Sequence, residues 1–251
     1  MSKLWKVTTL KMGELFVEKS SLTYQKDLGQ YLWIPMWATA ISGEGYNILV
    51  DTGIHSLEWV NENVCPCRQE ADETIVEALK KGVGWNPEDV DIVINTHLHY
   101  DHCGNNNLFK NAQFIVQKRE WEAAFHPIPC QDGIYLRELY DSRAVNYSQW
   151  RFVDGEEEVV PGVKVFPTPG HADGHQSVLV NTEEGIVCVS GDVSNLLENI
   201  RENIPAGILT CTKAIYASME AVRKRAEFII PGHEGAIQKY QSSCFPRIFK
   251  E

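Results

Sequence analysis

The segment THLHYDHCG, residues 96–104, restricts the fold of this chain more than any other feature. It places His97, His99, Asp101 and His102 within six positions directly after the apolar run Ile92–Ile94, in a chain with only eight histidines. His97 and His99 are two residues apart, so they cannot lie one turn apart on a helix. They fit a loop that follows a buried strand and curls around a metal ion, because imidazole and carboxylate groups are ligands of first-row transition metals.

Three other apolar runs are also followed closely by a histidine or an aspartate. The run at residues 163–166 precedes a PGH triplet that contains His171, and the run at 186–189 precedes Asp192. The run at 228–230 precedes a second PGH triplet, which contains His233. Because ligands of α/β proteins bind beyond the carboxyl ends of strands, we expect these side chains to converge on one point.

Apolar periodicity elsewhere predicts helices that alternate with these strands. Residues 75–83 and 118–125 have helical spacing, with Asp72 as the N-cap of the first helix and Gly82 or Gly84 at its end. A further apolar stripe runs from Ile215 to Ala226. No linker or repeat interrupts the alternation, which predicts one α/β domain over residues 1–251. The irregular segments at 65–73 and 126–150 are the expected sources of substrate contacts.

Charge and composition exclude several classes of function. The net charge of −11 disfavours a nucleic-acid partner. No apolar stretch approaches the roughly 18 residues of a membrane helix, and we see no signal peptide, so we expect no membrane partner and a cytoplasmic location. The seven cysteines are odd in number and scattered, and Cys65 and Cys67 form C-x-C without a second pair, so free thiols are expected.

The converging donors number five imidazoles (His97, His99, His102, His171, His233) and two carboxylates (Asp101, Asp192). Seven donors exceed the needs of one tetrahedral ion. They suit two divalent ions that share a bridging carboxylate and a bridging water. Zinc is the first expectation for both ions, and the same donors accept Mn, Fe and Co.

The order H-x-H-x-D-H, P-G-H, G-D and G-H resembles the metallo-β-lactamase superfamily, from Asp51 to His233. The resemblance implies an αββα sandwich with a dinuclear metal site at the edge of two β-sheets. It implies that His97, His99 and His171 bind the first metal ion, and that Asp101, His102 and His233 bind the second. Asp192 would bridge the two ions.

Four segments are similar to N-acyl homoserine lactonases and related pyridoxolactonase-type enzymes: IPMW (34–37), EVVPGV (158–163), PGHADGHQS (169–177) and CFP (244–246). The similarity implies a hydrolase that opens a small cyclic ester, with a small-molecule substrate and a possible homodimer. Asp101 would orient the attacking water and carry a proton to the leaving group. The lactonases have a tyrosine three residues after the bridging aspartate, where this chain has Asn195.

Asn195 leaves the substrate open. Its amide can donate a hydrogen bond to a substrate carbonyl, but it is shorter than tyrosine and is not an acid. A cyclic amide, a thioester or a phosphodiester is therefore the alternative substrate on the same site. A di-iron redox protein is a third class, and His99 argues against it because such proteins resemble the family but carry glutamate there.

The remaining site residues are expected around this centre. Tyr100 and Trp37 are candidate substrate contacts beside Asn195. Asp51 is expected to accept hydrogen bonds behind the ligands. His175 either orients a ligand or is a packed histidine bonded to the backbone.

Overall fold

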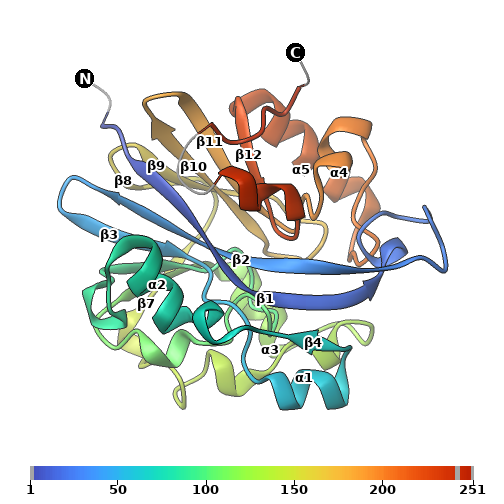
Figure 1. Cartoon of the computed structure of the whole chain (residues 1–251), viewed down its shortest axis with the longest axis horizontal. Helices are drawn as coiled ribbons and strands as arrows, with labels where there is room; N and C mark the ends of the chain where they lie inside the picture. Colours follow the sequence, from blue (N-terminus) through green and yellow to red (C-terminus); the bar gives the residue numbers. More distant parts are fainter. Residues whose placement is uncertain (1–2, 241–243, 250–251) are drawn as a thin grey trace.

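The computed structural model describes residues 3–240 and 244–249. Two β-sheets pack against each other, and helices cover their outer faces (Figure 1). Helices α1 (Leu57–Asn63), α2 (Ile75–Val83) and α3 (Lys118–Phe125) lie on one side of the pair of sheets. Helices α4 (Leu197–Glu202) and α5 (Thr212–Arg225) lie on the other. The predicted αββα sandwich is confirmed.

Within the described residues, the first sheet has seven strands and the second has five. The first sheet follows the order β4 (Cys67–Arg68), β1 (Lys6–Glu18), β2 (Tyr31–Gly43), β3 (Tyr46–Val50), β5 (Ile92–Ile94), β6 (Gln113–Gln117) and β7 (Trp150–Val153). The second follows the order β12 (Phe228–Pro231), β11 (Gly185–Gly191), β10 (Gln176–Thr182), β9 (Val163–Pro167) and β8 (Glu157–Val160).

Three apolar clusters fill the spaces between the four layers. The central cluster joins the sheets, with Ile48 and Ile94 from one and Val165 and Val178 from the other, all fully buried. Separate clusters lie beneath the helices of each outer layer. The central strands are therefore covered on both faces, which explains why they appear in the sequence as continuous apolar runs.

The strand directions bring the polar loop ends to one edge. Strands β3, β5 and β6 are parallel, and β11 and β12 are parallel. Strand β9 is antiparallel to β10, which is antiparallel to β11, so β9 runs in the same direction as β11. The segments that follow β9, β11 and β12 therefore start at the same edge of the second sheet. The contact between the rings of His97 and His171 places the segment after β5 beside them, as the sequence predicts.

The helices at residues 75–83 and 118–125 are confirmed, and one predicted cap is wrong. Thr74, not Asp72, is the N-cap of α2, and its Oγ1 accepts a hydrogen bond from the Glu77 amide at 3.4 Å. Asp72 lies in the preceding 3₁₀ turn, Ala71–Glu73. A threonine next to the first helical residue is the better-placed acceptor for the free N–H groups of the first turn. Gly84 ends the helix in the left-handed conformation, with φ 75°.

Apolar periodicity in the sequence does not indicate the long β1–β2 pair, in which the segment IPMW (34–37) lies. The structure puts these residues inside β2. Pro35 lies opposite Glu14, where the register of the pair shifts between Lys11 and Glu14. Proline is tolerated in a strand at such a bulge because it cannot donate a ladder hydrogen bond.

Among the described residues, no helix is both long and apolar enough to cross a membrane.

Candidate metal centre

The structure brings together all seven predicted donors. The loop after β5 supplies His97, His99, Asp101 and His102, whereas His171, Asp192 and His233 follow β9, β11 and β12. The ring centroids of His97 lie 4.3 Å from His99, 4.1 Å from His102 and 4.9 Å from His171. All of these side chains are buried except Asp101, which is half-buried.

The donors form two groups that a third group, which contains Asp192, links. Within each group the candidate ligand atoms lie within 4.8 Å of one another. The two groups are His97, His99 and His171, and Asp101, His102 and His233, and the linking group is His97, His102 and Asp192. Asp192 Oδ1 is 3.4 Å from His102 Nε2, and its Oδ2 is 3.4 Å from both His171 Nε2 and His233 Nε2. Its carboxylate therefore lies between the two groups.

Hydrogen bonds fix which ring nitrogen is available in four of the five histidines. In each, Nδ1 faces a hydroxyl, carboxylate or carbonyl oxygen, so it carries the hydrogen and leaves the lone pair on Nε2. The partners are Thr96 Oγ1 for His97 (3.0 Å), Asp51 Oδ2 for His102 (2.9 Å), the Ile208 carbonyl for His171 (2.9 Å) and the Pro35 carbonyl for His233 (3.0 Å).

Several polar atoms at the centre have no hydrogen-bond partner within the described part of the chain. They are the Nε2 atoms of His97 and His102 and the Oδ1 atom of Asp192, three residues whose candidate ligand atoms lie within 4.8 Å of one another. Buried polar atoms are nearly always paired, so three unpartnered atoms in one place indicate a ligand. Burial, aided by neighbouring histidines, lowers the pKa of His97 and of His99 well below the ordinary value. These imidazoles are therefore neutral, which is the form that binds a metal ion.

Electrostatics also favour an ionised Asp192. Burial alone raises the pKa of this carboxyl, but His233, His102 and His171 outweigh burial and bring it well below its usual value. The Asp192 and Asp101 carboxylates raise the pKa of His102 and of His233 despite their burial, so these two rings hold protons that a bound metal ion would displace. Together, the imidazole and carboxylate donors fit divalent first-row metal ions.

Asp51 and His175 support the centre from behind. The Asp51 carboxylate accepts hydrogen bonds from the Thr96 amide at 2.7 Å and from His102 Nδ1 at 2.9 Å, as the sequence predicts. His175 Nε2 accepts a hydrogen bond from the Asp192 amide at 3.0 Å. Burial lowers the pKa of His175 to about 3, so the ring stays neutral and able to accept. Both alternatives for His175 therefore apply: it is a packed histidine bonded to the backbone, and that bond positions the donor residue Asp192.

A cavity of about 530 Å³ opens beside the centre, lined by His99, Asp101, His171, Asp192 and His233. Its other walls are mainly apolar, with Leu15, Phe16, Val17, Leu22, Ile34, Val64, Ile134 and Ile208. No lysine or arginine lines this cavity among the described residues. An uncharged, partly aliphatic molecule fits such walls best.

Two of the three predicted substrate contacts line this cavity. Tyr100 and Asn195 are both among its lining residues and are nearly fully buried. The Oδ1 atom of Asn195 has no hydrogen-bond partner within the described residues. Burial raises the pKa of Tyr100 well above its ordinary value, so its phenol stays neutral.

Trp37 does not lie in the cavity, and the expectation for this residue is wrong in this structure. Its ring belongs to the apolar cluster between the two sheets, and its Nε1 donates to the Glu234 carbonyl at 3.1 Å. Alternation along β2 turns Trp37 inward to the core. Ile34 of the same strand lines the cavity instead.

The sequence reading missed Glu120, a fully buried carboxylate next to the centre. Its signal is present in the sequence: on the helix 118–125, Glu120 lies four residues before Ala124 and next to Trp121, so a charged residue interrupts the apolar stripe of that helix. A buried acid in such a stripe indicates hydrogen-bond donors across from it.

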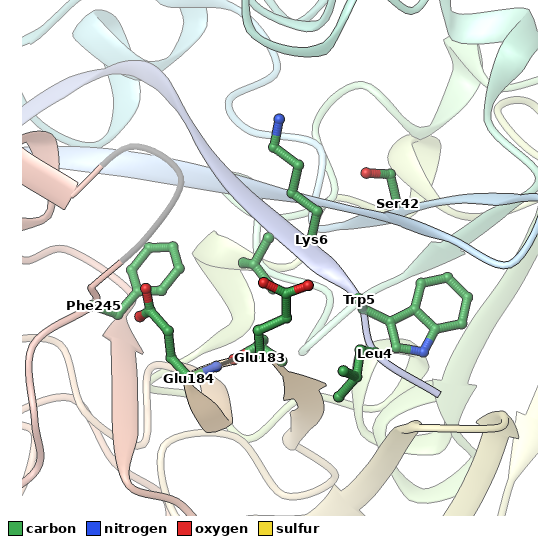
Figure 2. A pocket seen from close by; sticks show the side chains of 9 residues that line it. Leu4, Trp5, Lys6, Ser42, Glu183, Glu184 and Phe245 are labelled. Atoms are coloured by element: carbon green, nitrogen blue, oxygen red, sulfur yellow. Dashed lines mark hydrogen bonds between the residues drawn. The ribbon is translucent and has the colours of Figure 1, made fainter. Parts of the chain in front are cut away.

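A second cavity, of about 400 Å³, lies at the start of β1 (Figure 2). It is lined by Leu4, Trp5, Lys6, Val7, Ser42, Thr182, Glu183, Glu184 and Phe245. It shares no lining residue with the cavity at the metal centre.

Comparison with known proteins agrees with this geometry. Residues 33–233 match the metallo-β-lactamase superfamily, and the chain belongs to this superfamily. Its fold and its buried His/Asp cluster make it a metal-dependent hydrolase that uses divalent ions.

Several of the proteins that are similar to this chain are N-acyl homoserine lactonases. An N-acyl homoserine lactonase from Bacillus thuringiensis is 34% identical over 261 aligned residues, covering 98% of each chain. One from a Bacillus species is 36% identical over 236 residues, covering 88% of this chain and 90% of the relative. A solved N-acyl homoserine lactone hydrolase, with the product N-hexanoyl-L-homoserine bound at its catalytic metal centre, is 30% identical. It covers 95% of this chain and 96% of its own, with a TM-score of 0.81.

Proposed function

We propose that this chain opens the ring of N-acyl homoserine lactones. The observation that carries the proposal is the cluster of unpartnered ring nitrogens and carboxylate oxygen at an apolar cavity. The centre supplies the hydrolytic chemistry, and the apolar walls suit an acyl chain. The relatives named above support the choice of lactone.

We assign two zinc ions to the centre. His97, His99 and His171 would hold one ion, Asp101, His102 and His233 would hold the other, and Asp192 would bridge them. The linking position of the Asp192 carboxylate supports this assignment. Bound ions would supply a hydroxide near neutral pH and would polarise the ester carbonyl.

Asp101 is the residue we propose for proton transfer. Its carboxylate is half-buried, lines the cavity, and lies 3.7 Å from both His102 Nε2 and His233 Nε2. It therefore faces the metal centre and the substrate space at once. From this position it orients the attacking water, accepts its proton, and delivers that proton to the alkoxide that leaves when the ring opens.

Asn195 is the residue we propose for binding the substrate carbonyl. Its side chain lines the cavity, and its Oδ1 atom has no hydrogen-bond partner among the described residues. Rotation of the amide by half a turn would place the NH₂ group in that position. The backbone carbonyl of Asn195 accepts a hydrogen bond from the backbone amide of His233 at 2.9 Å, which fixes the position of Asn195 relative to the centre. An amide N–H from Asn195 would stabilise the negative charge that develops on the substrate oxygen.

The walls of the cavity argue against a phosphodiester substrate. A phosphodiester is anionic, and the described lining contains no lysine or arginine to bind it, whereas Glu18 lines the same cavity. The apolar walls instead stabilise an aliphatic chain, at about 0.8 kcal/mol for each buried methylene.

A substrate panel tests the proposal. Metal-loaded protein is assayed against N-acyl homoserine lactones of several chain lengths, aliphatic and aromatic lactones, matched lactams, a thioester and a phosphodiester. We expect the homoserine lactones to be opened fastest, with kcat/KM rising as the acyl chain lengthens. Turnover of a lactam or an aromatic lactone without turnover of any homoserine lactone would contradict the proposal.

Two further expectations remain proposals. All seven cysteines are free, which supports a location in the reducing cytoplasm. Homodimer formation stays a prediction from the sequence resemblance, and sedimentation of the metal-loaded protein measures it.

A further inference from the structure

Glu120 is a carboxylate buried without a cationic partner. It lies in the first turn of α3, its exposure is 0%, and no ion pair to lysine or arginine is found within the described residues. Burying an unpaired carboxylate costs several kcal/mol unless hydrogen bonds compensate it. Packing alone does not explain why a carboxylate is buried at this position.

Three donors compensate the Glu120 carboxylate, and they come from three separate segments. Oε1 accepts hydrogen bonds from the Leu98 amide at 2.9 Å and from the Tyr135 hydroxyl at 2.9 Å. Oε2 accepts a hydrogen bond from the Gly174 amide at 3.1 Å. One side chain therefore joins the loop after β5, the loop after β9 and the irregular segment after α3.

Each of these donors adjoins a proposed ligand of the first metal ion. Leu98 lies between His97 and His99 in the chain, and Gly174 lies three residues after His171. The Tyr135 ring packs edge-on against His99, with centroids 4.6 Å apart.

The two loops also meet directly at the centre. His171 Nε2 is 3.1 Å from His99 Nδ1. The spacing of the ligand atoms in the first group thus depends on how far apart the two loops are held.

The second group is supported by other residues. His102 is held by Asp51, and His233 is held by the Pro35 carbonyl. None of the hydrogen bonds of Glu120 reaches Asp101, His102 or His233.

We propose that Glu120 is a positioning residue that sets the separation of the His97–His99 loop from the His171 loop, and thereby the affinity of the first metal position. This inference rests on the ligand assignment of the proposed function. Glu120 touches neither the substrate cavity nor the ligand atoms, so its effect passes through the two loops.

Glu120→Gln is the informative variant because it keeps the size of the side chain. Its oxygen retains the bonds to Leu98 and Tyr135, while its NH₂ group faces the Gly174 amide, so two donors oppose each other. Only the link to the His171 loop is broken. Glu122→Gln, on the exposed face of the same helix, is the matched control. Tyr135→Phe removes one donor and leaves both backbone links intact.

The test is a titration of metal-stripped protein with Zn²⁺ in competition with a chromophoric chelator, repeated with Co²⁺ to follow its absorption spectrum. We expect Glu120→Gln to weaken one binding step about 10–100-fold, the range typical of residues behind metal ligands. The other step should change less than about 3-fold, and the Co²⁺ spectrum of the weakened site should shift. Tyr135→Phe should show a smaller effect, and Glu122→Gln none.

Two results would overturn the inference. One is unchanged Zn²⁺ affinity in Glu120→Gln. The other is an equal loss in both binding steps with unaltered Co²⁺ spectra, since that pattern indicates a general loss of stability. A single binding step in the wild-type protein would contradict the two-ion assignment alone, because that step can still be compared between Glu120→Gln and Glu122→Gln.

Discussion

The two cavities of this molecule are of similar size and differ in what their walls leave unsatisfied. At the metal centre, about 530 Å³ is bordered by buried nitrogen and oxygen atoms without partners. In the cavity of Figure 2, about 400 Å³, Trp5 Nε1 donates to the Pro161 carbonyl at 3.0 Å and Glu184 accepts from the Cys244 amide at 2.7 Å. Unpartnered buried atoms, rather than volume, therefore identify the functional cavity.

Among substitutions at the two cavities, loss of a metal-centre donor should have the largest effect. In His99→Ala or Asp192→Asn, most bound metal and nearly all lactone hydrolysis should disappear together, because each change removes a donor of a shared centre. Metal analysis and initial rates on the same preparation measure both. Full activity in metal-stripped protein would contradict the metal-dependent account.

The pH dependence of stability should reveal the cost of Glu120. Burial raises the pKa of this carboxyl from 4.5 to about 7, against the hydrogen bonds that lower it. Between these values the native state holds a proton that the unfolded state has released, so stability falls as pH rises.

Urea unfolding of the metal-free protein measures this effect. The free energy of unfolding of wild type minus that of Glu120→Gln should fall by about 3 kcal/mol between pH 4.5 and 7.5. A difference that stays constant over this range would show that Glu120 is ionised throughout.

Removal of the Asn195 amide should have a moderate effect confined to catalysis. We expect Asn195→Ala to lower kcat about 10-fold, the equivalent of one hydrogen bond of about 1.4 kcal/mol. Metal content should not change, because Asn195 is outside the two donor groups. If kcat is also unchanged, Asn195 does not bind the substrate carbonyl.

Substitutions in the second cavity should have the smallest effect. Lys6→Ala and Glu183→Gln should change the free energy of unfolding by no more than about 0.5 kcal/mol. Metal content and kcat/KM should match the wild type. A loss of activity in either variant would mean that the second cavity is coupled to the first, and the contrast between them would fail.

The donors were predictable because each of them follows a strand closely, four after β5 and one each after β9, β11 and β12. An apolar run followed by His171, Asp192 or His233 identifies both the strand and the donor at its end. Long-range placement was harder to predict. The sequence does not indicate that Trp37 faces the core while Ile34 faces the cavity, because β2 is buried on both faces here and its apolar residues do not alternate with polar ones.

Glu120 shows a different limit of prediction. Its three donors are a tyrosine hydroxyl and two backbone amides, and backbone amides carry no sequence signature. The interrupted stripe on α3 indicates a buried acid, but its partners are defined only when three distant segments are folded together. The same holds for His175, whose partner is the amide of Asp192.

The central claim is that two metal ions at this centre open a homoserine lactone ring. Its most direct test adds Zn²⁺ stepwise to metal-stripped protein and follows the proton released from N-hexanoyl-homoserine lactone in a pH-stat. We predict that the rate rises until two equivalents of Zn²⁺ are bound and then stays constant. Full activity without metal, a plateau at one equivalent, or no ring opening at two would contradict the account.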